Sequence, residues 1–249
     1  MNIRIIVAVH KPYRMPQDGV YLPLHVGHMG KEDIGFQGDD TGENISGKNA
    51  NFCELTGLYW AWKNLDADYI GLAHYRRHFV GSKYCRDKWE RIAGQEEIEK
   101  VLQKVDVVLP PKRNYFIETT YNQYAHAHHA VDLDTARDIL EEKYPEYLPS
   151  FEGCMKSTSG HKFNMFIMRK DLLNSYCQWL FDVLFELEKR LDISNYSPND
   201  KRVFGFVSER LMDVWIVTNN IKYLEMPVLF MEKQNWMVKG GKFLKRKFK

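Results

Sequence analysis

A predicted helix followed by a buried strand, between residues 51 and 79, is the sequence feature that most constrains the fold. Apolar side chains recur at three- and four-residue spacing through Asn51–Asn64, which predicts a helix with one apolar face. After a short turn, the uninterrupted apolar run Tyr69–Ala73 predicts a strand that is buried on both faces. The combination favours an α/β domain, in which helices cover a central sheet.

Positive and titratable side chains follow this strand directly where it ends. They are His74, Arg76, Arg77 and His78. Because the ligands of open α/β sheets bind beyond the carboxyl ends of the strands, we predict an anionic ligand at this position. The alternative interpretation is that these side chains form structural ion pairs or lie solvated at the edge of the sheet.

Further apolar runs and periodic patterns complete a single α/β domain with a mostly parallel central sheet, which we assign to residues 1–238. Strands are predicted at Ile3–Val9, Val105–Leu109, Lys162–Met168 and Tyr223–Met231. Helices are predicted at Gln95–Lys104, from the N-cap Asp134 towards Tyr144, along the apolar stripe from Leu173 to Leu191, and at Lys201–Val217.

Candidate ligand-binding residues also follow two other predicted strands. His10, Lys11 and Tyr13 come after the first strand, and Lys112 and Arg113 come after the strand that ends at residue 109. We expect Lys11 and Tyr13 to meet a phosphate and a base, and the cations after parallel strands to converge on one anion. The chain contains neither a G-x-G-x-x-G motif nor a P-loop.

The segment Met15–Asn51 is rich in Gly, Asp and Asn and lacks periodicity, which predicts a binding loop or lid, or a mobile segment. The net charge of +2 gives no support for nucleic-acid binding. No apolar run reaches the ~20 residues that span a bilayer, and no signal-peptide pattern begins the chain, so we expect a cytoplasmic location. The four cysteines form no C-x-x-C pair and are expected to be reduced, mostly buried thiols.

The last residues, 239–249, combine six Lys and Arg residues with Phe243, Leu244 and Phe248. This composition suits an anionic membrane surface, and we treat the segment as a basic amphipathic tail that would place the protein on the inner face of the plasma membrane. The alternative is a solvated terminus.

Three motifs resemble those of a bacterial family of capsule and exopolysaccharide biosynthesis proteins, a former domain of unknown function that includes galactofuranosyltransferases. The motifs are Asn51–Asn64 with Ile70–Phe79, Gly160–Phe166, and Arg202–Leu211. The resemblance implies a GT-A-like (Rossmann-like) fold and transfer of a sugar, with inversion, from a nucleotide donor, expected to be UDP-linked. It also implies a lipid-linked glycan as the acceptor.

Roles for individual residues follow from this reaction. Glu209 is the first candidate for the base that takes the acceptor proton, and Asp213 is the second. The alternative for either residue is an ordinary ion pair on the helix surface. His74, Arg76 and Arg77, helped by Lys112 or Arg113, would neutralise the leaving diphosphate. Glu54, His161, Lys162 and Asn164 are assigned to the sugar or acceptor, and Glu54 is alternatively a core carboxylate paired with Arg76.

The sequence departs from the wider GT-A pattern, in which an Asp-x-Asp after a buried strand holds a divalent metal. His74-Tyr75-Arg76 occupies that place. Asp66-Ala67-Asp68 precedes its strand and Asp132-Leu133-Asp134 fits an N-cap, so we assign no metal ligand, and dependence on Mn²⁺ or Mg²⁺ stays open.

Two other functions remain as alternatives. One is a non-catalytic subunit that binds a nucleotide sugar or a glycan in a polysaccharide assembly complex. The other is a metallohydrolase built on His126, His128 and His129, since His126 and His129 would lie one turn apart in a helix.

Overall fold

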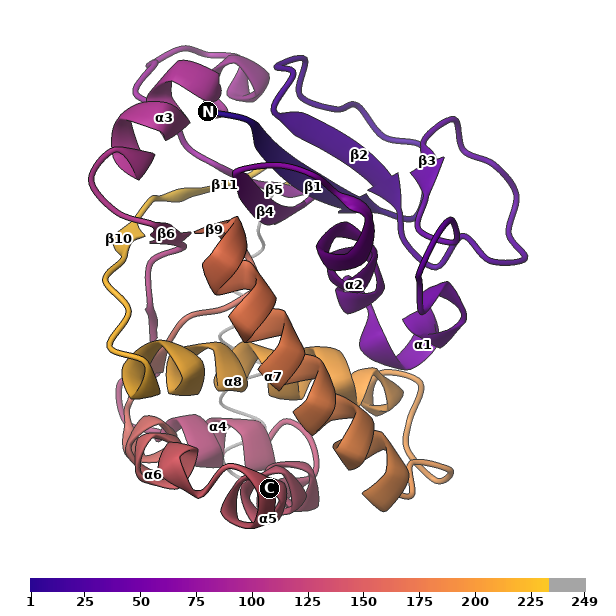
Figure 1. Cartoon of the computed structure of the whole chain (residues 1–249), viewed down its shortest axis with the longest axis vertical. Helices are drawn as coiled ribbons and strands as arrows, with labels where there is room; N and C mark the ends of the chain where they lie inside the picture. Colours follow the sequence, from indigo (N-terminus) through magenta and orange to yellow (C-terminus); the bar gives the residue numbers. More distant parts are fainter. Residues whose placement is uncertain (233–249) are drawn as a thin grey trace.

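The computed structural model describes residues 1–232, and its centre is a mixed β-sheet (Figure 1). The strand order is β10 (Leu224–Glu225), β6 (Val107–Leu109), β9 (Phe166–Arg169), β4 (Tyr69–His74), β1 (Ile3–Val9), β2 (Tyr21–His25) and β3 (Gln37–Gly38). All of these run in one direction except β9, which lies antiparallel between β4 and β6. The predicted single α/β domain with a mostly parallel sheet is therefore confirmed.

Two shorter pairings involve the remaining strands. β5 (Arg77–Phe79) reverses direction after β4, pairs antiparallel with its end and pairs with β11 (Val228–Phe230). A separate ladder joins β7 (Arg113–Asn114) to β8 (Ser159–Gly160).

Helices cover both faces of the sheet, because successive residues of each buried strand point to opposite sides. They are α1 (Asn49–Phe52), α2 (Leu55–Asn64), α3 (Gln95–Leu102), α4 (Thr120–Ala125), α5 (Ala130–Lys143), α6 (Leu148–Lys156), α7 (Lys170–Arg190) and α8 (Val203–Thr218). Ile6 belongs to a large apolar cluster with α2, α7 and α8, whereas Ile5 belongs to a second cluster with α3. Figure 1 shows α7 and α8 on one side of the sheet and α3 on the other.

The antiparallel strand β9 approaches β4 closely because residue 71 is a glycine. A Cβ at Gly71 would lie 2.9 Å from the Phe166 carbonyl oxygen and 3.0 Å from the Ile5 side chain. A larger residue would push β9 away from the centre of the sheet.

The single helix predicted for Asn51–Asn64 is divided into two helices, α1 and α2. The chain breaks between α1 and α2 at Cys53, whose φ of 54° and ψ of −131° are not helical. The carbonyl of Cys53 accepts hydrogen bonds from the side chains of Asn49 and Thr56, and these bonds stabilise the break. Glu54 therefore follows a kink in the backbone.

Three other predicted elements and the expected burial of the cysteines are corrected. The predicted strand Lys162–Met168 begins only at Phe166, and the last predicted strand is divided at Pro227 into β10 and β11. Helix α5 begins at Ala130, so Asp134 lies inside it, and its carboxylate accepts a hydrogen bond from Tyr121 of α4. Of the four cysteines, all unpaired, only Cys177 is fully buried.

The segment predicted to be irregular contains β2, which the sequence pattern missed because Pro23 interrupts it. Proline lacks the N–H that a ladder needs and is confined to positions without a partner. β3 pairs only with Leu24 and His25, so no strand faces the Pro23 nitrogen on that side.

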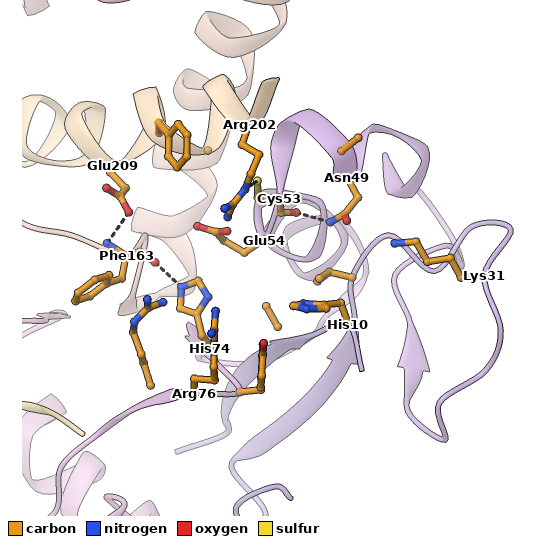
Figure 2. A pocket seen from close by; sticks show the side chains of 17 residues that line it. His10, Lys31, Asn49, Cys53, Glu54, His74, Arg76, Phe163, Arg202 and Glu209 are labelled. Carbon is orange, nitrogen blue, oxygen red and sulfur yellow. Dashed lines mark hydrogen bonds between the residues drawn. The ribbon is translucent and has the colours of Figure 1, made fainter. Parts of the chain in front are cut away.

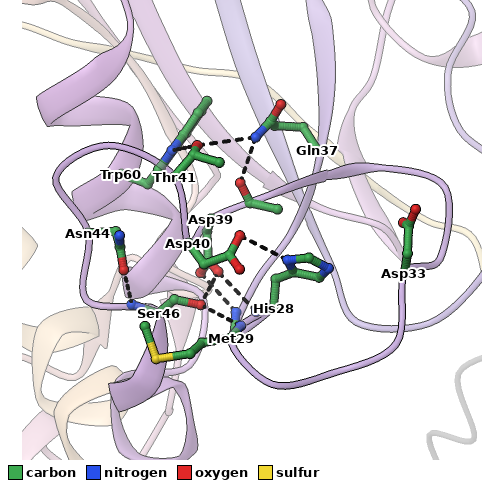
Figure 3. A network of polar contacts seen from close by, with 12 residues as sticks. His28, Met29, Asp33, Gln37, Asp39, Asp40, Thr41, Asn44, Ser46 and Trp60 are labelled. Carbon is green, nitrogen blue, oxygen red and sulfur yellow. Dashed lines mark hydrogen bonds and ion pairs between the residues drawn. The ribbon is translucent and has the colours of Figure 1, made fainter.

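Much of the same segment is ordered by one buried carboxylate, that of Asp39 (Figure 3). Its two oxygens accept hydrogen bonds from the backbone N–H groups of Gly27 and His28 and from the hydroxyls of Ser46 and Thr56, at 2.5 to 3.0 Å. Thr56 lies in α2, so this carboxylate fixes the loop to the helix. The predicted binding loop is thus tied to the core rather than free.

No helix between residues 1 and 232 combines the length and the apolar composition that a membrane crossing requires. The predicted basic tail, residues 239–249, lies outside the described residues.

The Asp39 network leads to a stability prediction. Replacing Asp39 with Ala removes the acceptor shared by two backbone N–H groups and two hydroxyls, so we expect a loss of about 3 kcal/mol in the free energy of unfolding, measured by urea denaturation. Asp40→Ala is the matched control, because Asp40 is partly exposed and contacts only His28 in this network, and it should cost less than about 1 kcal/mol. Equal effects of the two substitutions would contradict this account.

Candidate functional site

A cavity of about 670 Å³ opens at the carboxyl ends of β1 and β4, where it is bounded by the α1–α2 break and the start of α8 (Figure 2). Its ionisable lining residues are His10, Lys31, Glu54, His74, Arg76, Arg77, Arg202 and Glu209. This is the position at which the sequence predicted a ligand. The start of α8, which no side chain caps, adds the positive end of its helix dipole.

Several cations lie around this cavity, and their combined charge affects the pKa of His10. Burial lowers the pKa of the His10 imidazole, and Arg76, Lys11, Lys31 and Arg202 lower it further by repulsion. These four residues come from separate segments of the chain, so the fold creates a concentration of positive charge that no single motif contains.

Arg77 is the most buried arginine of the group, and its guanidinium lies over the ring of Phe163, 4.4 Å from the centroid. Its Nε atom is buried without a hydrogen-bond partner among residues 1–232. Because this atom is closed to solvent, Arg77 faces the cavity through other atoms of its side chain. Arg76, by contrast, donates to the carboxylate of Glu232 at 3.1 Å, not to Glu54 as the alternative prediction had it.

A tight turn at Phe163 and Asn164 forms the floor between the cations and the acidic side chains. Both residues have positive φ, 80° and 52°. The carbonyl of Phe163 contacts His74 Nε2 at 2.5 Å, so this nitrogen carries the proton. Burial lowers the pKa of His74, which keeps the imidazole neutral near pH 7.

Glu209 lies in the wall with both of its carboxylate oxygens occupied. One accepts the backbone N–H of Phe163 at 3.0 Å, and the other accepts from Arg210 at 2.8 Å and lies 3.5 Å from Lys162 Nζ. Burial acts to raise the pKa of Glu209, but Lys162 and Arg210 outweigh it and hold that pKa below its usual value. This carboxylate is therefore a weak proton acceptor.

Glu54 is placed differently. Its Oε1 accepts a hydrogen bond from the Asn164 amide at 2.7 Å, and no hydrogen bond within residues 1–232 engages its Oε2. Figure 2 shows the Glu54 carboxylate pointing into the cavity between Arg202 and His74. The kink at Cys53 produces this orientation, because it turns the chain just before Glu54.

The other predicted site residues lie outside the cavity lining. Lys11 Nζ lies 5.4 Å from the ring centroid of Tyr75, and Tyr13 packs edge-on against the same ring, so both are beside the rim. Asn164 and Lys162 do not line the cavity but contact residues that do. The Asn164 amide donates to Glu54, and Lys162 lies near the Glu209 carboxylate.

Asp213 and His161 form a buried pair of their own. Asp213 accepts hydrogen bonds from the His161 backbone and from its Nδ1, the latter at 2.5 Å, and Lys112 Nζ lies 4.0 Å from the same carboxylate. Lys112 and Arg113 follow β6, which β9 separates from β4, so they do not reach the cavity. The prediction that the cations after β4 and after β6 converge on one anion is therefore wrong.

The described residues do not fit a metal centre. No three His, Cys, Asp or Glu side chains within residues 1–232 are grouped to hold a metal ion. His126 contacts Glu118, and His128 contacts Asp200. α4 ends at Ala125, so His126 and His129 do not share a helical turn as the metallohydrolase alternative required.

Sequence reasoning missed Lys31, Cys53 and Arg202 as lining residues. Arg202 donates from Nε to the Cys53 sulfur at 3.1 Å, which leaves the end of its guanidinium facing the cavity. Its place at the start of the motif Arg202–Leu211 was the available signal. Lys31 had none, because it lies in a loop without periodicity.

Comparison with known proteins identifies the family. The model of the domain of unknown function DUF4422 matches residues 4–220. The chain belongs to this family. It is also similar to the apo structure of WbbM, a bifunctional glycosyltransferase, with 34% sequence identity and a TM-score of 0.87. That match covers 94% of this chain and 46% of the WbbM chain, so this protein spans about half of WbbM. No curated protein matches the chain.

The pKa of Lys162 leads to a test of the electrostatics behind the cavity wall. Burial lowers this pKa from 10.5 to about 7, and Arg210 adds to the effect. Between these two values the unfolded chain binds the extra proton, so the contribution of Lys162 to the free energy of unfolding rises with pH.

We therefore expect the parent protein to gain stability relative to Lys162→Met as the pH rises from about 7 to about 9, by at most about 1.4 kcal/mol per pH unit. Urea denaturation across this range measures the difference. The matched control is Lys156→Met, at an exposed lysine of α6. A pH-independent difference for Lys162→Met would show that Lys162 stays charged.

Proposed function

We propose that this protein is a glycosyltransferase that transfers a sugar from a nucleoside diphosphate to a hydroxyl group. The observation that carries the proposal is one cavity that is lined both by Arg76, Arg77 and Arg202 and by the carboxylates of Glu54 and Glu209. Transfer needs positive charge where the diphosphate leaves and a carboxylate where the acceptor hydroxyl loses its proton. The family and the similarity to half of a bifunctional glycosyltransferase support the same reaction class.

The diphosphate would bind beside the arginines that line the cavity. As the bond between the sugar C1 and the phosphate oxygen breaks, negative charge accumulates on the leaving nucleoside diphosphate. Arg77 lines this space, and Arg202 extends into it from the start of α8. Charge-assisted hydrogen bonds from arginine suit phosphate oxygens well.

The nucleoside would extend towards the rim formed by the loop after β1. His10, Tyr13 and Tyr75 place aromatic rings there in edge-on contact. The Lys11 ammonium lies over the same rings. A base can stack on such a surface while its phosphates reach the cations, and UDP is the nucleotide we propose.

Glu54 is the base that the geometry favours over Glu209, the first prediction from the sequence. A general base needs an oxygen that is open to the acceptor hydroxyl, and Glu54 Oε2 is open whereas both oxygens of Glu209 are engaged. Proton transfer to Glu54 would accompany attack of the acceptor oxygen on C1 from the face opposite the diphosphate, which inverts the anomeric centre. Glu209 would instead hold Phe163 in place.

The finer features of the proposal come from the family resemblance. They are galactofuranose as a candidate sugar, a lipid-linked glycan as the acceptor, and a role in capsule or exopolysaccharide synthesis at the cytoplasmic side of the membrane. A non-catalytic binding subunit is the competing function, and turnover of a nucleotide sugar by the purified protein would exclude it.

The donor-site assignment predicts weaker nucleotide binding after loss of either Arg77 or Arg202. Arg77→Met and Arg202→Met should each weaken UDP binding by about 1.5 to 3 kcal/mol, measured by isothermal titration calorimetry. Arg4→Met is the control, because Arg4 lies at the opposite end of β1 and bonds to the Gly19 carbonyl. Unchanged UDP affinity in both folded variants would overturn the assignment.

The base assignment predicts a different kinetic pattern. Glu54→Gln keeps an oxygen for Asn164 but cannot accept a proton, so kcat should fall about 10²- to 10⁴-fold while UDP affinity is retained. Transfer is measured with the nucleotide sugar that gives the largest thermal shift in a panel. Near-normal kcat in Glu54→Gln together with an inactive but folded Glu209→Gln would return the role to Glu209.

The cations in the cavity also predict the response to chelation. Because Arg76, Arg77 and Arg202 supply the charge that neutralises the diphosphate, activity should largely survive excess EDTA. Activity that disappears in EDTA and returns with Mn²⁺ or Mg²⁺ would show that a metal shares this task.

A further inference from the structure

The loop between β6 and α4 carries an exposed apolar tip, Phe116 and Ile117. These side chains are 80% and 68% exposed, although both are large and apolar and adjacent in the sequence. Phe116 also has a φ of 62°, a left-handed conformation that a bulky residue rarely adopts. Neither the core nor the cavity accounts for the outward direction of this pair.

The tip is held firmly from both sides. Tyr115 is buried, and its backbone N–H donates to the Thr158 carbonyl at 2.8 Å. The Phe116 N–H donates to the Asn114 side chain at 2.6 Å. On the far side, buried Glu118 contacts His126. The two apolar side chains are therefore presented by an ordered support.

Positive charge lies near the tip in the sequence and across the β7–β8 pairing. Arg113 is exposed in β7, three residues before Phe116, and Lys112 precedes it with its Nζ 4.0 Å from the Asp213 carboxylate. Lys156, at the end of α6, is 80% exposed, lies 3.9 Å from the Glu152 carboxylate and precedes the strand β8 that pairs with β7. An apolar pair beside exposed cations is complementary to a bilayer whose surface carries anionic lipid headgroups.

We propose that this loop docks the protein on an anionic membrane surface, with Phe116 and Ile117 inserted among the headgroups. A protein partner fits less well, because a stable protein interface needs about 800 Å² from each partner and this tip consists of two side chains. The inference does not depend on the glycosyltransferase reaction or on the basic tail.

The support of the loop connects this surface to the cavity. Lys162 Nζ lies 5.3 Å from the ring centroid of Tyr115, next to the tip, and 3.5 Å from the carboxylate of Glu209 in the cavity wall. Docking through the tip therefore fixes the cavity wall relative to the bilayer.

The test is sedimentation of the full chain with vesicles of phosphatidylglycerol and phosphatidylcholine, compared with phosphatidylcholine alone. The tip variant is Phe116→Asn with Ile117→Ser, because asparagine tolerates the left-handed backbone at residue 116. The control is Met29→Ser with Val131→Ser, which removes two apolar side chains that are about half exposed elsewhere. Thermal unfolding checks that both variants are folded.

We expect the tip variant to lower the partition coefficient for anionic vesicles at least about tenfold while the control variant binds as the parent does. The ratio of partition coefficients between parent and tip variant should be the same when both chains are truncated after Val238. This truncation distinguishes the contribution of the tip from that of the basic tail. Parent-like binding of the tip variant, or a parent that does not bind anionic vesicles, overturns the proposal. Concentration-dependent self-association that the tip variant abolishes would also overturn it, in favour of a protein contact.

A second measurement places the tip directly. Tryptophan fluorescence of Phe116→Trp should be quenched by brominated lipids more strongly than that of the parent, whose six tryptophans supply the background. Quenching equal to the parent would show that residue 116 stays outside the bilayer.

Discussion

The turn at Phe163 and Asn164 is the constraint on which the cavity depends. Its backbone groups engage His74 on one side and Glu209 on the other. The Asn164 side chain donates to Glu54 and to the Gly205 carbonyl, and it accepts a hydrogen bond from Ser208. One turn thus connects the end of β4, the α1–α2 break and α8, which are the three walls of the cavity.

Such a turn requires its surroundings to hold it. A non-glycine residue in the left-handed region costs roughly 1 to 2 kcal/mol, and two occur here in succession. The hydrogen bonds of Asn164 are buried and well satisfied, so they offset this strain and select one conformation. Helix α8 packs directly against the α1–α2 break, where a Cβ at Gly205 would come into ordinary contact with the Cys53 side chain at 3.4 Å.

The parts of the fold that could be predicted from the sequence are those with strong hydrophobic periodicity. The apolar runs at Ile3–Val9 and Tyr69–Ala73 and the stripe along α7 depend on burial alone, and the structure confirms them. The reversed strand β9 and the kink at Cys53 depend on tertiary contacts and on positive φ in ordinary residues, which no local pattern reveals.

The candidate site divides in the same way. Arg76 and Arg77 could be predicted because they directly follow a buried strand, and ligands of open α/β sheets bind beyond the carboxyl ends of the strands. Lys31 and Arg202 reach the same cavity from segments that are far away in the sequence, so only the fold brings them together. The prediction for Lys112 and Arg113 failed for a different reason. The strand before them, β6, is present, but its neighbour is β9 rather than β4, so these cations lie away from the cavity.

The ion pair between Arg76 and Glu232 has a consequence for turnover. The positive charge of Arg76 is already paired without a ligand, because its Nη1 lies 3.1 Å from Oε2 of Glu232. In the proposed reaction, a diphosphate that takes the same guanidinium nitrogen would compete with this carboxylate, and the two would exchange places as the nucleotide arrives and leaves. Glu232 would then weaken the contact of Arg76 with the donor and with the spent nucleotide alike.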